Sequence, residues 1–113
     1  MNINDATDAV VSALEGAEIP ASIDPADVNV PGAWVAAREV DVFTAGGGAL
    51  VTVDVYLIAP DIMPRDAMDE LSALSTRALD VLDIEAMSTN DALQLPDGGR
   101  PKPAFKITTK VEV

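Results

Sequence analysis

Carboxylates are the only side chains present in quantity that could carry out acid–base chemistry, and they gather at two places. Asp5 and Asp8 begin one segment with helical apolar spacing. Asp66, Asp69 and Glu70 begin a second such segment. Paired carboxylates hydrolyse glycosides when a cleft holds them roughly 5 to 10 Å apart. Acidic residues are also favoured in the first turn of a helix, because the helix dipole is positive there. We therefore interpret both groups as helix starts, with a glycosidase site as the less favoured alternative.

Two missing residue types exclude most other catalytic chemistry. The chain has no cysteine and no histidine, so it offers no thiolate nucleophile, no Ser–His–Asp triad and no cysteine-based zinc site. A Ser–Lys dyad of Ser72 or Ser75 with Lys106 has no sequence signature to support it. No calcium loop and no dinucleotide-binding glycine motif occurs. We expect no enzymatic activity, no bound metal ion and no cofactor.

A triple glycine separates two β-type segments. It could form a hairpin tip or a phosphate-binding loop. Gly46, Gly47 and Gly48 close the segment Thr44–Gly48. A phosphate-binding loop continues through Gly-Lys-Ser/Thr into a helix, whereas here Leu50 opens a run with strand character. We therefore interpret the segment as a hairpin tip. Its exposed position predicts that Thr44, Gly46, Gly47 and Gly48 contact a partner.

Charge is distributed unevenly along the 113 residues. The net charge is −12, from 19 acidic and 7 basic residues, and such a surface repels the phosphate backbone of nucleic acids. Four of the seven basic residues nevertheless follow one another near the end of the sequence: Arg100, Lys102, Lys106 and Lys110. One interpretation is a cationic strand face that aids solubility. The other is a basic surface that meets the acidic surface of another copy.

The elements that would position these residues follow from hydrophobic periodicity. Residues 5–17 and 64–82 place apolar side chains at helical spacing, and Met68, Leu71 and Leu79 belong to the predicted buried stripe of the second helix. Strands are predicted at residues 33–38, 39–43, 50–58, 84–95 and 105–113, where residues 39–43 either continue the first strand or form their own. The proline-rich residues 18–32 predict an extended connection, and residues 96–99 a turn.

This order of elements predicts a single α+β domain over residues 1–113, with two helices packed on one face of a mostly antiparallel, four- to five-stranded sheet. Trp34, the one tryptophan, lies on a short predicted strand. It is either half-buried against a helix or an interface anchor, because tryptophan is enriched at interaction hot spots. No apolar run reaches the roughly 20 residues of a membrane span, and acidic residues stand where a signal peptide would be basic. We therefore expect the protein in the cytoplasm of the cell that makes it.

The order of elements resembles that of the tail terminator proteins of long, non-contractile-tailed bacteriophages, over nearly the whole chain. Those proteins have a short amino-terminal helix and a proline-rich connection, then a strand that corresponds to Pro31–Val35. A glycine-rich loop and a long alternating strand follow, here Gly46–Leu57, and a second helix, here Arg65–Leu82. The closing strand corresponds to Lys110–Val113. The family has no diagnostic motif, and residues 96–103 are shorter and richer in proline and glycine than its pattern.

The resemblance implies a structural virion protein at the head-proximal end of a siphophage tail, assembled in the host cytoplasm. Its copies would form a hexameric ring that caps the tail tube, ends tube polymerisation and offers an interface to head-completion and neck proteins. DNA would pass through an acidic lumen without specific binding. Another neck, connector or minor tail component, or a small non-viral binding domain, is the alternative. The residues predicted to form contacts are Trp34, Thr44, Gly46, Gly47, Gly48, Arg100, Lys102, Lys106 and Lys110.

Overall fold

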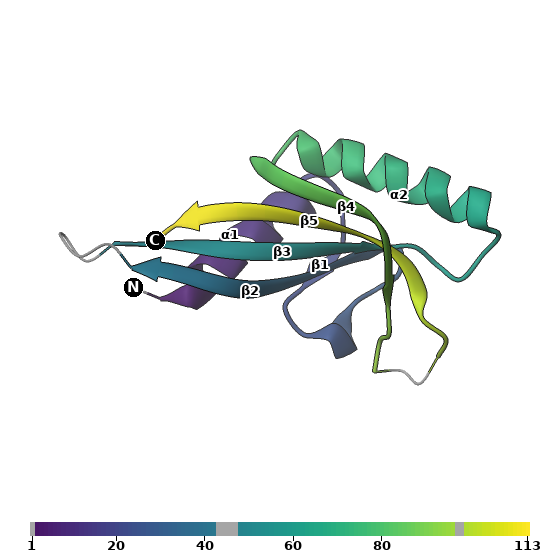
Figure 1. Ribbon diagram of the computed structural model, residues 1–113, viewed down its shortest axis with the longest axis horizontal. Helices are drawn as coiled ribbons and strands as arrows, with labels where there is room; N and C mark the ends of the chain where they lie inside the picture. The colour runs from purple at the N-terminus through teal and green to yellow at the C-terminus, as the bar shows by residue number, and fades with distance from the viewer. Residues whose placement is uncertain (1, 43–47, 97–98) are drawn as a thin grey trace.

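The computed structural model describes residues 2–42, 48–96 and 99–113 (Figure 1). Within them the elements are α1 (Ile3–Gly16), β1 (Ala21–Ser22), the short 3-10 helix η1 (Pro25–Asp27), β2 (Gly32–Val42), β3 (Ala49–Ile58), α2 (Pro64–Leu79), β4 (Ile84–Leu93) and β5 (Lys102–Glu112).

Residues 39–42 continue β2, so the predicted first strand is one long element, and Phe43 lies outside the described residues. The second helix ends at Leu79 and not at Leu82. The N–H groups of Val81 and Leu82 both donate to the carbonyl of Ala78, at 3.1 and 3.0 Å, and this turn closes the helix.

The strands form one sheet in the order β1-β2-β3-β5-β4. Neighbouring strands are antiparallel except β1 and β2, which are parallel. The strand that comes last in the sequence, β5, therefore lies between β3 and β4. One row across the three central strands places Val35 beside Val55 and Val55 beside Ile107.

Both helices pack on the same face of the sheet, which confirms the predicted α+β architecture. Alternate residues of β2, β3 and β5 turn towards them and are almost completely buried, among them Val35, Val55 and Ile107. They meet Leu14 of α1 and Leu71 of α2 in one continuous core. In Figure 1, α1 crosses one side of the sheet and α2 lies above the β4 end. No helix among the described residues is long and apolar enough to cross a membrane.

The buried stripe of α2 differs from the prediction. Leu71 is buried, but Met68 and Leu79 are 47% and 54% exposed. The side chains that face the sheet are Ala67, Leu71, Leu74, Ser75 and Ala78. The buried side of α2 thus includes small and polar residues in place of Met68 and Leu79. Ser75 is tolerated there because its hydroxyl donates to the carbonyl of Ser72 at 2.9 Å.

Gly32 begins β2 at a place with no room for a side chain. A Cβ atom there would overlap the carbonyl oxygen of Asn29 and would lie 2.7 Å from that of Pro20. The Pro20 carbonyl also accepts a hydrogen bond of 2.8 Å from the N–H of Ala33. The glycine therefore lets the chain before β1 lie directly against the start of β2.

Helix α1 ends with a left-handed residue that is not glycine. Glu18 has φ 63°, the region that a Cβ disfavours and that helix ends most often fill with glycine. The N–H of Ile19 donates to the carbonyl of Leu14 at 2.9 Å across this turn. The backbone geometry is the one that a glycine at position 18 would adopt with less strain.

Replacing Glu18 with glycine should therefore stabilise the protein. We expect the free energy of unfolding to rise by about 1 kcal/mol, since the left-handed conformation loses its steric penalty. Urea denaturation of Glu18→Gly measures it. Glu18→Ala is the control, because it removes the same charge but keeps a Cβ, and it should give no gain. A Glu18→Gly variant less stable than wild type would contradict the expectation.

Candidate interaction surface

One face of the sheet has no helix over it. Across β2, β3 and β5, one row on this face joins Trp34, Tyr56 and Lys106. Asp54 and Thr108 lie in the next row. We call the surface formed by Trp34, Arg38, Asp54, Tyr56, Lys106 and Thr108 the open face. One end of this side of the sheet is covered, where Val28 and Val30 after η1 and Leu95 after β4 pack on Ile58 and Ala104, next to Trp34 and Tyr56.

A buried carboxylate fixes an arginine on the open face. Asp54 is 4% exposed; its Oδ1 accepts a hydrogen bond from the Thr108 hydroxyl at 3.0 Å. Its Oδ2 lies 2.9 Å from Nε of Arg38, whose side chain is 51% exposed. The Arg38 guanidinium is thus held by a buried carboxylate and still reaches solvent.

A β-bulge places Arg38 there. The pairing of β2 with β3 shifts between Ala37 and Glu39, so Arg38 is the extra residue of the bulge. The shift also returns Val40 to the helix side, where it packs against the core. Bulges re-aim side chains in this way, and this one adds a cation to the open face while preserving the core.

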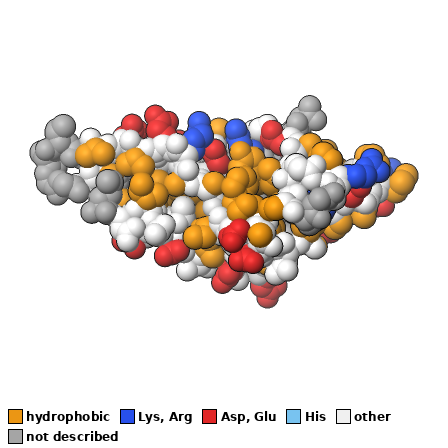
Figure 2. Space-filling view, turned by 90° about the horizontal axis from the view of Figure 1, so that it is seen from below, with side chains coloured by type: hydrophobic (Ala, Val, Ile, Leu, Met, Phe, Trp, Pro, Cys, Tyr) orange, Lys and Arg blue, Asp and Glu red, His pale blue; other side chains and the backbone are white. Residues whose placement is uncertain are grey.

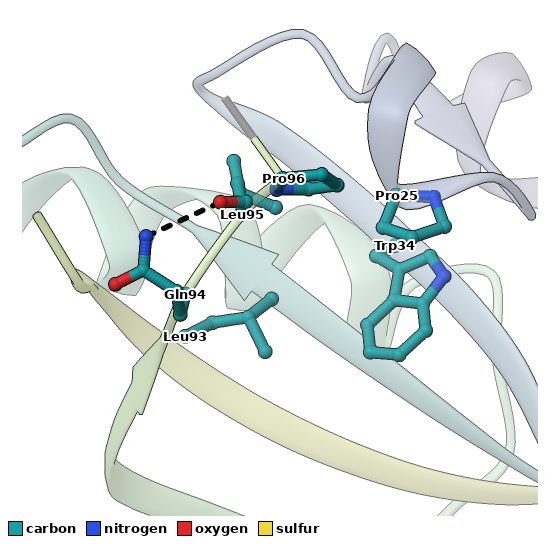
Figure 3. A pocket seen from close by; sticks show the side chains of 6 residues that line it. All are labelled: Pro25, Trp34, Leu93, Gln94, Leu95 and Pro96. Carbon is teal, nitrogen blue, oxygen red and sulfur yellow. Dashed lines mark hydrogen bonds between the residues drawn. The ribbon is translucent and has the colours of Figure 1, made fainter. Parts of the chain in front are cut away.

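Trp34 stacks on Tyr56 beside this ion pair, with ring centroids 5.2 Å apart and an angle of 20° between the rings. The indole Nε1 donates to the carbonyl of Ile23 at 3.1 Å. Trp34 is half-buried, and its ring forms one wall of a pocket of about 260 Å³ (Figure 3). The pocket is lined by Pro25, Trp34, Leu93, Gln94, Leu95 and Pro96.

The predicted basic cluster is divided between two places. Lys106 and Lys110 lie on the open side of β5, in the rows of Tyr56 and Thr52. Lys110 Nζ is 3.6 Å from Glu85 of β4. Arg100 lies instead in the connection before β5, with its Nε 3.6 Å from Asp61. In Figure 2, which shows the molecule from the β2 side, basic side chains stand together at the middle of the upper edge.

Most of the glycine-rich loop lies outside the residues that the structure describes. Thr44, Gly46 and Gly47 lie outside the described residues, and Gly48 is half-buried just before β3. Lys102 is half-buried at the start of β5, opposite Leu93. Of the residues predicted to form contacts, the structure therefore brings together Trp34, Lys106 and Lys110.

Sequence reasoning missed Arg38, Asp54 and Tyr56 as members of this surface. Asp54 gave one signal, since it is the one charged residue of the strand Ala49–Ile58. Arg38 gave none, because its orientation depends on the bulge.

The acidic groups weighed as catalytic residues lie at the surface, where Asp5 lines an open hollow together with Asn2, Ala9 and the end of β5. Asp5, Asp8, Asp66 and Asp69 are exposed on the outer sides of the two helices. Among the described residues, no three acidic side chains gather closely enough to hold a metal ion. Neither a protein-family model nor a curated protein matches this chain. The candidate site is therefore the open face, where an ion pair, a buried hydrogen bond and a stacked aromatic pair lie next to one another.

Proposed function

We propose that this chain is a structural subunit of a bacteriophage tail, similar in role to a tail terminator. Its copies form a ring, most simply of six, on the end of the tail tube, where the ring ends tube polymerisation and meets the head-completion proteins. The observation that supports this proposal best is the open face. A sheet face without helices over it presents Trp34, Tyr56 and Arg38, and these three residue types dominate the energetics of protein interfaces.

The open face is also ordered before any partner arrives. The Trp34 ring is fixed by its hydrogen bond to Ile23 and by its stacking on Tyr56. Arg38 is fixed by Asp54. A surface that is already ordered loses less side-chain entropy on binding. This favours the open face as a binding surface.

The net charge of −12 suits a ring that surrounds DNA. Carboxylates around a channel repel the phosphate backbone, so DNA passes without adhering. The exposed acids of α2, Asp66 and Asp69, are available to line such a channel. A ring whose lumen is basic or apolar would contradict this part of the proposal.

The pocket beside Trp34 is the observation that favours the second candidate, a small binding domain outside any virion. Its volume of about 260 Å³ falls just below the range of about 300 to 1,000 Å³ that is usual for small-molecule sites. Its apolar lining offers few polar groups to orient a ligand. A thermal shift with a small apolar ligand would favour this candidate.

The proposal is tested by native mass spectrometry over a concentration series, together with co-sedimentation on tail tubes. We expect a discrete six-subunit species, or binding of the chain to tube ends where it halts tube growth. A ring that closes only on a tube would appear in the second measurement alone. A chain that stays monomeric and also ignores tubes would overturn the proposal.

Reversing the charge of Lys106 and Lys110 together should weaken assembly. Two lysines on the open side of β5 become carboxylates, and like charges at an interface cost several kcal/mol. We expect the association constant to fall about tenfold or more, while the monomer keeps its circular dichroism spectrum. The control is Arg65→Glu with Arg100→Glu, which changes the net charge equally outside the open face. Equal loss of assembly in both variants would assign the effect to net charge.

A further inference from the structure

We propose that the open face docks the exposed side of α1 from a second copy of this chain. The proposal rests on the proposed function and names the two surfaces that join neighbouring ring subunits. The basic groups of the open face meet the carboxylates of α1, and the stacked aromatic rings lie beside them.

The exposed side of α1 is acidic and has small side chains between its acids. Asp8 and Glu15 are exposed, lie two turns apart on the side that faces away from the core, and share it with Ser12. The helix contains no basic residue. Gly16 ends it, and a Cβ atom there would meet nothing within 4 Å. The small side chains between the carboxylates allow a neighbouring surface to approach the helix backbone closely.

The open face carries two cations near the aromatic pair, whereas Glu39, Asp41 and Glu112, the other acids on this side of β2 and β5, lie in rows further from Trp34 and Tyr56. Arg38 is held by Asp54 but half exposed, and Lys106 forms no ion pair with any other described residue. They lie two strands apart and are offset by three to four residues along the strands, which separates their backbones by roughly 15 Å. Asp8 and Glu15 are separated by about 10 Å along the helix axis. The long arginine and lysine side chains span the difference, so one helix can place a carboxylate near each cation. The proposed orientation sets Glu15 opposite Lys106 and Asp8 opposite Arg38.

The two surfaces lie on opposite sides of the sheet. Helix α1 packs on the face of β2 and β3 that is turned away from Trp34 and Tyr56. A contact between the open face of one copy and α1 of the next leaves both copies with an unused surface. Such a head-to-tail contact continues until the array closes into a ring or extends as a filament. A two-fold dimer of rigid copies cannot satisfy it, because the two surfaces of each copy face in opposite directions.

The sheet edges are less suited to the contact. The β2 edge is interrupted by the bulge at Ala37/Glu39, and Arg38, Glu39 and Asp41 add charges. The other edge, β4, has two register shifts. Bulges and charges on edge strands hinder pairing with another strand. The face of the sheet, and not its edge, is therefore the assembly surface.

A charge exchange tests the proposal. Lys106→Glu and Glu15→Lys change the net charge by two units in opposite directions, so a chain with both substitutions keeps the wild-type value of −12. We expect each single variant to lower the association constant about tenfold or more, because it places like charges across the contact. The double variant exchanges the two charges, so opposite charges again face each other between copies. It should recover association to within about threefold of wild type.

The measurement is native mass spectrometry with sedimentation velocity, on full-length chains at low salt. Arg65→Glu and Asp69→Lys, both on exposed positions of α2, are matched controls with the same charge changes and should associate like wild type. The far-UV circular dichroism spectrum should be unchanged in all variants, since Glu15 and Lys106 lie outside the core. A lysine next to the carboxyl end of α1 is compatible with the helix dipole.

Three outcomes would overturn the inference. The first is a Glu15→Lys variant that assembles like wild type, because α1 would then lie outside the contact. The second is a double variant as weak as the single ones. The third is a wild-type chain that remains monomeric in solution. In the first two cases a ring still forms and the proposed function stands. In the third, only binding to tube ends could support that function.

Discussion

Gly32→Ala is expected to lower the free energy of unfolding by about 3 kcal/mol or more. The new Cβ would overlap the Asn29 carbonyl and press on that of Pro20. Both obstacles are backbone atoms, so no rotamer change can relieve them. The structure can make room only by moving Pro20 away, and this breaks the hydrogen bond from Ala33 that joins the chain before β1 to β2. Urea denaturation followed by circular dichroism measures the loss.

Gly16→Ala is the matched control for that substitution. Position 16 ends α1, and its added Cβ meets nothing within 4 Å. Alanine also favours helix more than glycine does, so this variant should be as stable as wild type or slightly more stable. Hydrogen exchange at the Ala33 amide adds a local readout, because only the Gly32 variant should accelerate it. A loss below about 1 kcal/mol in Gly32→Ala would show that the chain before β1 moves away at little cost.

Leu71→Ala should be the second large effect, with a loss of about 3 kcal/mol and a melting temperature lower by roughly 10 °C. Leu71 is 1% exposed and packs in the core between α2 and the sheet. Truncation leaves a cavity that neighbouring elements fill only in part. Thermal denaturation of the variant measures the effect.

Met68→Ala is the informative comparison, because hydrophobic periodicity places Met68 and Leu71 in the same buried stripe. The structure leaves Met68 47% exposed, so its truncation should cost less than about 1 kcal/mol. Equal losses in the two variants would indicate that the helix face is rotated from the orientation described above. The pair of variants therefore tests the orientation of α2 directly.

The helix orientation illustrates where sequence reasoning succeeds and where it stops. The apolar periodicity of residues 64–82 identifies a helix, but Met68 and Leu79 are apolar residues on the flank, and Ser75 is a polar residue inside. Periodicity alone treats every apolar residue as buried. A buried serine that satisfies its hydroxyl within its own helix is invisible to that reasoning.

The strands also separate what sequence reasoning can predict from what it cannot. The alternation in β3 and β5 is strong because helices cover only one face of the sheet, and the positions of both strands follow from sequence. The insertion of β5 between β3 and β4 depends on contacts between distant segments. The bulge that turns Arg38 towards Asp54 also depends on pairing between strands. Trp34 and Lys106 could thus be proposed from composition, but their meeting with Arg38 on one surface could not.

The place of β5 in the sheet has a consequence for the timing of folding during synthesis. The first three strands leave the ribosome early, yet β3 gains its second neighbour and β4 its only one when β5 arrives. Sheets whose partners are distant in sequence fold slowly, because a long loop must close first. The row from Trp34 through Tyr56 is completed by Lys106 of that same strand. A nascent chain therefore acquires its complete open face only after β5 has been made, so unfinished copies could not enter the assembly that we propose.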